Sequence, residues 1–220
     1  MSRGLGDVYK RQAQECLKYI VKELHTVVFS TVDEKGYPVT CAIDMMDGDE
    51  SSLYFLTARG KQFFSRLKAN RHIAFTALRG KDTLSSIAVS VQGEAKELGS
   101  GRVEDLFQKN SYMYEIYPTR QSREALTVFQ IYRGRGEWFD LSKKPIERFD
   151  FSFGEASRKQ EGYVITRKCI HCGVCSQTCP QQCIDVAAGV IRQQNCLHCG
   201  NCYRRCPIKA VERRGRGDTE

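Results

Sequence analysis

The 220-residue sequence lacks any apolar run close to the roughly 18 residues that a helix needs to cross a bilayer, so we expect no membrane-spanning segment. Its first residues lack a charged start followed by an apolar stretch and a small-residue cleavage site, which argues against export and a secreted disulfide scaffold. The formal net charge is +8, yet the basic residues lack an aromatic-rich recognition motif. These absences argue against a membrane protein and against a nucleic-acid-binding protein.

What the sequence has in abundance is cysteine, with eleven in the chain. Eight of them form two runs in which two residues separate the first three cysteines, three separate the last pair, and a proline follows. The runs are Cys169, Cys172, Cys175 and Cys179 before Pro180, and Cys196, Cys199, Cys202 and Cys206 before Pro207. This is the spacing with which bacterial two-cluster ferredoxins bind 4Fe–4S clusters.

The geometry of such a run predicts which cysteines serve which cluster. Three cysteines on a short loop can wrap around one cluster, whereas the fourth, set before a proline, points away and serves the other cluster. We therefore expect two sets of metal ligands: Cys169, Cys172, Cys175 and Cys206 for the first 4Fe–4S cluster, and Cys196, Cys199, Cys202 and Cys179 for the second. Zinc sites normally use cysteine pairs separated by a longer stretch. So many thiols required for iron predict a reducing compartment, the cytoplasm.

The two runs belong to an internal repeat with an offset of 27 residues. The repeat resembles the pseudo-twofold bacterial ferredoxin module over roughly 162–212. In that module each half is a short strand, a cysteine loop and a short helix, and we expect the strands at 163–165 and 190–191. Gly173 and Gly200 would let the loops turn tightly and bring backbone N–H groups toward the cluster sulfurs.

Three cysteines lie outside the runs. Cys183 occupies the position that Ala210 has in the second copy, and we interpret it as a small buried residue. A swapped or alternative ligand remains an open interpretation of Cys183. We interpret Cys16, on a predicted helix, and Cys41, in a predicted strand, as core residues. Two histidines at matching repeat positions are interpreted as supporting or solvent-facing side chains rather than ligands: His171 and His198.

The rest of the chain has room for one domain of ordinary size. Residues 1–12 show no periodicity, and we expect them to be a non-structural N-terminal remnant. From Ala13 the pattern predicts a helix, then strands at 25–32, 37–45, 52–57, 72–78 and 87–98, helices at 60–69 and 103–109, and a hairpin of 126–132 with 137–141 around glycines at 134 and 136. Many strands with few helices indicate a small antiparallel barrel.

Three stretches resemble the FMN-binding split barrel of the pyridoxamine-phosphate-oxidase-like family. They are Gly36-Tyr37-Pro38-Val39-Thr40, Leu56-Thr57-Ala58-Arg59-Gly60-Lys61 followed by Leu67 and Asn70, and Val89-Ser90-Val91-Gln92-Gly93-Glu94-Ala95. The resemblance implies an α+β fold with an antiparallel split β-barrel over 13–150. A linker (151–161) and the ferredoxin module with its basic tail (162–220) follow. It also implies a homodimer that binds FMN through Val39, Thr40, Cys41, Thr57, Ala58, Arg59, Lys61 and Gln62.

The loop after the predicted strand at 52–57 also fits a phosphate on physical grounds. A strand that ends in Thr57 and enters a helix near Lys61 offers a hydroxyl and unpaired N–H groups to an anion. Arg59 can grip a phosphate bidentately while Lys61 adds a point charge. The alternative is that both are surface cations, but positive charge is unfavourable at a helix start, which favours a bound anion.

The sequence also departs from the oxidase itself. Thr40 and Ala88 stand at the approximate places where the oxidase has an arginine and an amide residue. Its substrate-gripping basic residues have no clear match, because Trp138-Phe139-Asp140 leads into the ferredoxin module. These differences argue against oxidation of pyridoxamine phosphate. Trp138 could stack on a flavin or belong to the core.

A flavin takes two electrons and releases them singly, whereas each cluster carries one. The sequence therefore predicts a cytoplasmic FMN- and iron–sulfur-dependent oxidoreductase or electron-transfer protein that passes electrons between flavin and two 4Fe–4S clusters. Its partner would be a redox protein or a small-molecule electron donor or acceptor. The alternative is a ferredoxin-type electron carrier whose barrel is a flavin-free docking or ligand-binding scaffold. No dedicated catalytic acid or base is evident.

Overall fold

The computed structural model describes residues 3–157 and 161–214. These residues form two compact units. The first contains residues 3–79, 88–136 and 151–157, and the second contains 80–87, 137–150 and 161–214. No described helix is both long and apolar enough to cross a membrane.

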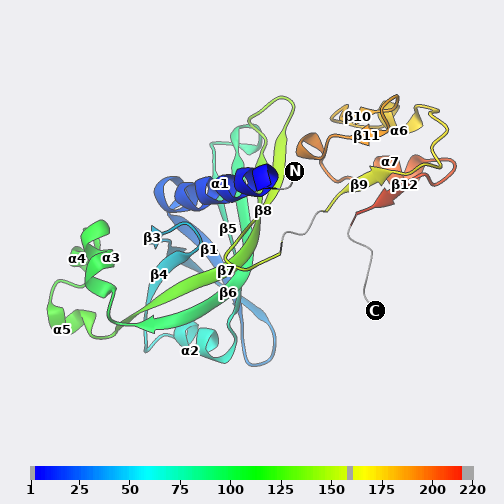
Figure 1. Ribbon diagram of the computed structural model, residues 1–220. Coiled ribbons are helices and arrows are strands. Elements are labelled where there is room, and N and C mark those ends of the chain that lie inside the picture. Colours follow the sequence, from blue (N-terminus) through cyan, green and yellow to red (C-terminus); the bar gives the residue numbers. More distant parts are fainter. Residues whose placement is uncertain (1–2, 158–160, 215–220) are drawn as a thin grey trace. The chain divides into compact units, whose positions relative to one another are not determined.

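The first unit is built on a curled antiparallel sheet (Figure 1). In the described residues its hydrogen-bonded order is β2-β1-β5-β6-β7-β4-β3, with β8 also paired to β7. The strands are β1 (Thr26–Val32), β2 (Pro38–Asp44), β3 (Asp47–Gly48), β4 (Leu53–Ala58), β5 (His72–Arg79), β6 (Ile87–Gly99), β7 (Leu126–Asp140) and β8 (Glu147–Phe153). Because β2 also approaches β4, from near the other end of that order, the sheet curls into the predicted split barrel.

Alternating apolar residues of these strands fill the barrel with aromatic rings. Phe29 of β1 lies 5.1 Å from Phe55 of β4 between ring centroids, and Phe55 lies 5.5 Å from Phe129 of β7. Phe63 and Phe75 close the cluster against Phe29. Each such pair contributes about 0.5–1.5 kcal/mol beyond its buried area, so this cluster stabilises the interior of the barrel.

The helix before β1 is longer than the sequence predicts. Helix α1 spans Arg3–Tyr19 and continues into a π-helical turn, η1 (Ile20–Leu24). The expectation that 1–12 is non-structural is therefore wrong for 3–12, while residues 1–2 lie outside the described residues. The buried face of α1 includes Ala13 and Leu17, and once this segment is helical each preceding residue can add a hydrogen bond at little cost.

The glycines of β7 do not form a turn. We expected a hairpin around residues 134–136, but β7 runs through them and pairs with β8 instead. A Cβ atom on Gly134 would lie 2.7 Å from Phe153 Cζ, and one on Gly136 would lie 2.4 Å from Phe151 Cζ. These glycines make room for two buried phenylalanines of β8. Because β8 runs from Glu147 to Phe153, the predicted domain boundary at 150/151 falls inside a strand.

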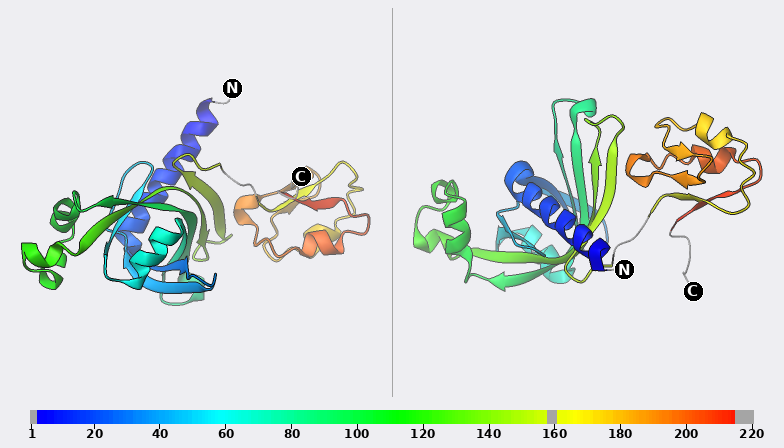
Figure 2. Two further views of the ribbon diagram at one scale, coloured as in Figure 1. Left: turned by 90° about the horizontal axis from the view of Figure 1, so that it is seen from below. Right: turned by 45° about the horizontal axis from the view of Figure 1, so that its top comes forward.

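Short helices join the long strands. They are α2 (Gln62–Ala69) after β4, η2 (Thr83–Ser85) after β5, and α3 (Val103–Lys109), α4 (Met113–Ile116) and α5 (Arg120–Arg123) after β6. Figure 2 shows α3, α4 and α5 grouped at one end of the sheet. Leu106 and Phe107 of α3 pack there against Tyr54 and Val128.

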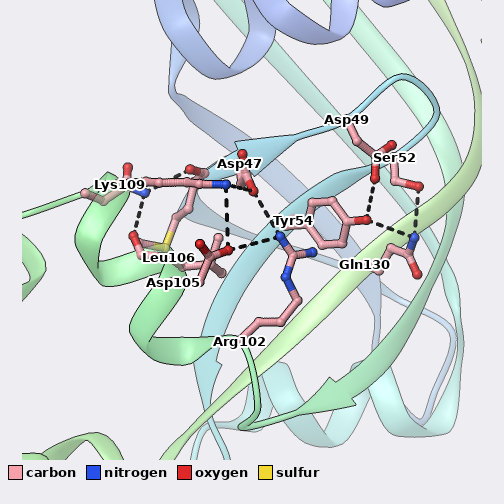
Figure 3. A network of polar contacts seen from close by, with 11 residues as sticks. Asp47, Asp49, Ser52, Tyr54, Arg102, Asp105, Leu106, Lys109 and Gln130 are labelled. Carbon is pink, nitrogen blue, oxygen red and sulfur yellow. Dashed lines mark hydrogen bonds and ion pairs between the residues drawn. The ribbon is translucent and has the colours of Figure 1, made fainter.

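A polar network ties α3 to the barrel (Figure 3). The Arg102 guanidinium lies 4.1 Å from the centre of the Tyr54 ring and donates to Asp47 at 3.1 Å. Lys109 donates to the same Asp47 carboxylate at 2.8 Å, and the Tyr54 hydroxyl donates to Asp49 at 2.5 Å. Since every charge in this network has a partner, we interpret it as a structural clamp.

Besides η2 and the parts of β6, β7 and β8 that lie within 80–87 and 137–150, the second unit contains two small antiparallel sheets and two short helices among its described residues. Its other elements are β9 (Tyr163–Ile165), α6 (Val174–Gln177), β10 (Ile184–Asp185), β11 (Val190–Ile191), η3 (Gln193–Asn195), α7 (Asn201–Arg205) and β12 (Val211–Arg213). Strand β9 pairs with β12 and β10 pairs with β11, so the two predicted strands, 163–165 and 190–191, are confirmed.

Candidate functional site

The eight cysteines of the two runs surround two small cavities in the second unit. One cavity is lined by Cys169, Cys172, Cys175 and Cys206. The other is lined by Cys179, Cys196, Cys199 and Cys202, and also by Cys183. The folded chain thus brings together three cysteines of one run and the last cysteine of the other, in the two sets of four named above.

The loops that carry these cysteines repeat the same backbone conformation. His171 and His198 have φ values of 54° and 55°, and Gly173 and Gly200, which precede α6 and α7, have 80° and 79°. The left-handed glycines let each loop turn directly into its helix. The duplication seen in the sequence is therefore also a duplication of local structure.

Backbone N–H groups point at several of the thiols. The His171 N–H lies 3.4 Å from Cys169 Sγ, and the His198 N–H lies 3.4 Å from Cys196 Sγ. The Ala210 N–H donates to Cys206 Sγ at 3.1 Å. Donors in these positions stabilise negative charge on sulfur, which a thiolate ligand requires.

The two histidine side chains lie in different surroundings. His171 Nδ1 lies 2.7 Å from the carbonyl oxygen of Val186. Burial lowers the pKa of His198 to about 4, so this imidazole is neutral at physiological pH. Both positions agree with supporting roles.

In the first unit, the end of β4 leads into α2 as predicted for the phosphate loop. Thr57 is 3% exposed, and its Oγ1 atom has no hydrogen-bond partner in the structure. Arg59, Lys61 and Gln62 are exposed, whereas Ala58 is half-buried. Lys61 is the N-cap residue of α2, and its side chain makes no capping hydrogen bond. The loop therefore combines uncapped N–H groups, an unsatisfied hydroxyl and exposed cations.

Strand β2 and helix α2 bring two more residues to this loop. Burial raises the pKa of the Cys41 thiol, and the nearby charges of Arg66 and Lys61 oppose that effect. Arg66 Nε also donates to Thr31 Oγ1 at 2.8 Å. The sequence analysis did not name Arg66, although its position four residues after Gln62 places it on the same helix face.

Part of the positive charge near the loop is already neutralised. Lys68 lies 2.9 Å from Glu97, and Thr127 donates to the same carboxylate at 2.8 Å. Lys68 and Thr127 lower the pKa of Glu97, and the charge of Arg59 adds to the effect. Lys68 is thus a paired surface cation, which distinguishes it from Lys61.

The predicted ring-binding residues lie on an edge strand. Val39 and Cys41 are half-buried and Thr40 is exposed, all on β2. Because β2 ends the hydrogen-bonded order of the described sheet, its outer backbone groups pair with no described strand. Trp138 stacks on Phe149 across the β7–β8 hairpin, with centroids 5.8 Å apart and planes 7° apart.

A cavity of about 610 Å³ in the first unit contains none of the predicted flavin residues. It lies over β1, β5, β6 and β7, and Glu94 forms part of its wall. The Tyr132 hydroxyl and then the Arg133 guanidinium lower the pKa of Glu94 to about 2, and Arg71 lies 2.9 Å from the same carboxylate. Glu94 is therefore a fully partnered buried anion.

Comparison with known families gives the same division of the chain. Residues 13–136 match the family model of pyridoxamine 5'-phosphate oxidase, and residues 168–210 match that of the 4Fe-4S dicluster domain. The chain therefore belongs to the pyridoxamine 5'-phosphate oxidase family and carries in addition a 4Fe–4S dicluster domain. This combination defines a redox protein, and it confirms both family resemblances inferred from sequence.

Solved structures agree on the fold. A NimC/NimA family protein from Clostridium acetobutylicum is 14% identical, with a TM-score of 0.55, and covers 70% of this chain and 100% of its own. A second protein from the same organism is described as related to general stress protein 26 of B. subtilis, of the pyridoxinephosphate oxidase family. It is 19% identical, with a TM-score of 0.50, and the match covers 66% of this chain and 96% of that protein. A search of curated proteins gives no match.

Proposed function

We propose that this protein is an FMN- and iron–sulfur-dependent oxidoreductase that passes electrons between a flavin on the barrel and two 4Fe–4S clusters in the dicluster domain. One observation carries the proposal: a single chain combines an uncapped, cationic loop on a split barrel with two four-cysteine cavities. When bound, a flavin supplies two-electron chemistry and each cluster supplies one-electron chemistry.

The cysteine cavities fit 4Fe–4S clusters. Cys169, Cys172, Cys175 and Cys206 would hold one cluster, and Cys196, Cys199, Cys202 and Cys179 the other. The backbone N–H groups that point at the sulfur atoms of Cys169, Cys196 and Cys206 would stabilise these residues as thiolates. The apolar residues around them, among them Ile184, Ile191 and Val211, would exclude water from the sulfurs.

The loop after β4 fits the phosphate end of FMN. Arg59, Lys61, Gln62 and the first N–H groups of α2 would hold the phosphate, with Arg66 as an added cation. Thr57 Oγ1, which is buried and has no hydrogen-bond partner among the described residues, would find one there after a small local movement that exposes it. The exposed edge of β2 at Val39, Thr40 and Cys41 would lie along the flavin ring.

We further propose a homodimer in a reducing compartment, with a redox protein or a small molecule as electron donor or acceptor. The family resemblance supports the dimer, and the many thiols support the compartment. Sedimentation of the purified protein would test the dimer.

Anaerobic reductive titration tests the proposed function. Purified protein should take up about four electrons per chain, two for flavin and one for each cluster. An R59A/K61A variant should lose the flavin share and keep the rest. The matched variant C199A should lose one cluster's share and keep the flavin. Uptake of about two electrons by the parent protein, with no flavin released on denaturation, would instead support the flavin-free carrier.

A further inference from the structure

Cys183 is a fifth thiol at the second cysteine cavity. It is 1% exposed and lines that cavity together with Cys179, Cys196, Cys199 and Cys202. Its Sγ atom lies 3.5 Å from Cys179 Sγ, and Cys196 is its other thiol neighbour. Cys183 thus contacts one of the four cysteines that we assign to the second cluster and lies near another.

The internal repeat supplies a natural comparison for this thiol. Lys209 and Gln182 occupy matching positions, with φ values of 53° and 49°, and each donates its N–H at 3.2 Å to the carbonyl of the preceding cysteine, Cys206 or Cys179. The next residue is Ala210 in one copy, also 1% exposed, and Cys183 in the other. The two loops therefore share their backbone and differ by a sulfur atom facing one cavity.

We propose that Cys183 is a reserve ligand of the second cluster, able to replace Cys179. The Cys183 thiol releases its proton to solvent, a Cys183–iron bond forms, the Cys179–iron bond breaks, and Cys179 takes up a proton. No electron is gained or lost. A small buried filler would need only the volume of Ala210, whereas a thiol 3.5 Å from the resident ligand can reach the same iron after a short movement of the loop.

The test measures iron and acid-labile sulfide per chain in anaerobically reconstituted full-length protein, with no need for activity. C206A removes the matching ligand of the first cluster, where Ala210 offers no thiol, and should lower iron to about half of the parental content. C179A should keep near-parental iron. C179A/C183A should fall to about half, as C206A does. The reduced C179A protein should also give a changed electron paramagnetic resonance spectrum for one cluster, because one ligand has moved.

A gain-of-function arm keeps the proposal open to refutation even if C179A fails to accumulate. C206A/A210C leaves four thiols at the first cavity, the fourth at position 210, just as C179A leaves the fourth thiol of the second cavity at position 183. It should restore iron to near the parental content. Loss of half the iron in C179A alone, or no recovery in C206A/A210C, would overturn the proposal. The inference rests on the proposed cluster ligands, so full iron in C206A would overturn both. Absence of flavin would affect only the proposed function.

Discussion

Arg66 Nε donates a hydrogen bond to Thr31 Oγ1 over 2.8 Å, which holds a cation of α2 against β1 beside Cys41. If the loop binds the FMN phosphate, R66A should weaken FMN binding about 10- to 100-fold, because a hydrogen bond to a charged group contributes about 1.5–3 kcal/mol. Fluorescence titration of flavin-free protein measures this affinity. K68A is the matched control on the same helix, since Lys68 is already paired with Glu97, and should change the affinity about twofold or less. Equal losses in both variants would mean that Arg66 contributes only general positive charge.

The buried hydroxyl of Thr57 predicts two effects of opposite sign. T57V keeps the shape of the side chain and removes a polar atom that has no partner in the structure. We expect the flavin-free protein to gain about 1 kcal/mol in unfolding free energy, while FMN binding weakens about tenfold. T57S keeps the hydroxyl and should retain affinity. A T57V protein with lower stability and unchanged affinity would show that the hydroxyl serves the barrel alone.

Gly93 allows two strands to approach closely. A Cβ atom at this position would lie 2.5 Å from the carbonyl oxygen of Arg133 on β7, so G93A should cost about 1–3 kcal/mol of unfolding free energy. G101A is the control, since a Cβ atom there meets nothing within 4 Å. Urea denaturation followed by Trp138 fluorescence compares them. Equal stability of G93A and the parent protein would contradict the close approach of β6 and β7.

Glu94 gives the barrel a defined dependence on pH. Its pKa is lowered from 4.5 to about 2 by Tyr132, Arg133 and Arg71, so its stabilising effect is complete above pH 4.5. That effect is lost as the pH falls from 4.5 through 2, because the carboxylate becomes protonated. In E94Q this part of the dependence should disappear. The difference in urea midpoint between the parent protein and E94Q is measured at pH 6 and at pH 3. This difference separates the contribution of Glu94 from the acid loss of the clusters, which affects both proteins. A difference that stays constant between the two pH values would contradict the lowered pKa.

The sequence predicts the second unit well because its information is local. Cysteine spacing sets which thiols can share a loop, and the proline after Cys179 or Cys206 directs the fourth thiol away. Strands at 163–165 and 190–191 follow from the same short repeat. In the barrel, the order of the longer strands up to β6 and the bounds of helix α3 at 103–109 also follow from the local sequence pattern.

What the sequence could not reveal depends on contacts between distant residues. Glycines usually mark turns, so the continuity of β7 emerges only when Phe151 and Phe153 are seen to fill the space beside Gly136 and Gly134. Arg66 is an ordinary helix cation until β1 and β2 are placed beside it. The spare thiol of Cys183 likewise gains meaning only from its distance to Cys179.

The most direct measurement is cofactor analysis of protein purified without oxygen. The account predicts about eight iron and eight sulfide per chain, a broad iron–sulfur absorption band, and about one FMN released on denaturation. Colourless protein, free of acid-labile sulfide after careful reconstitution, would contradict it.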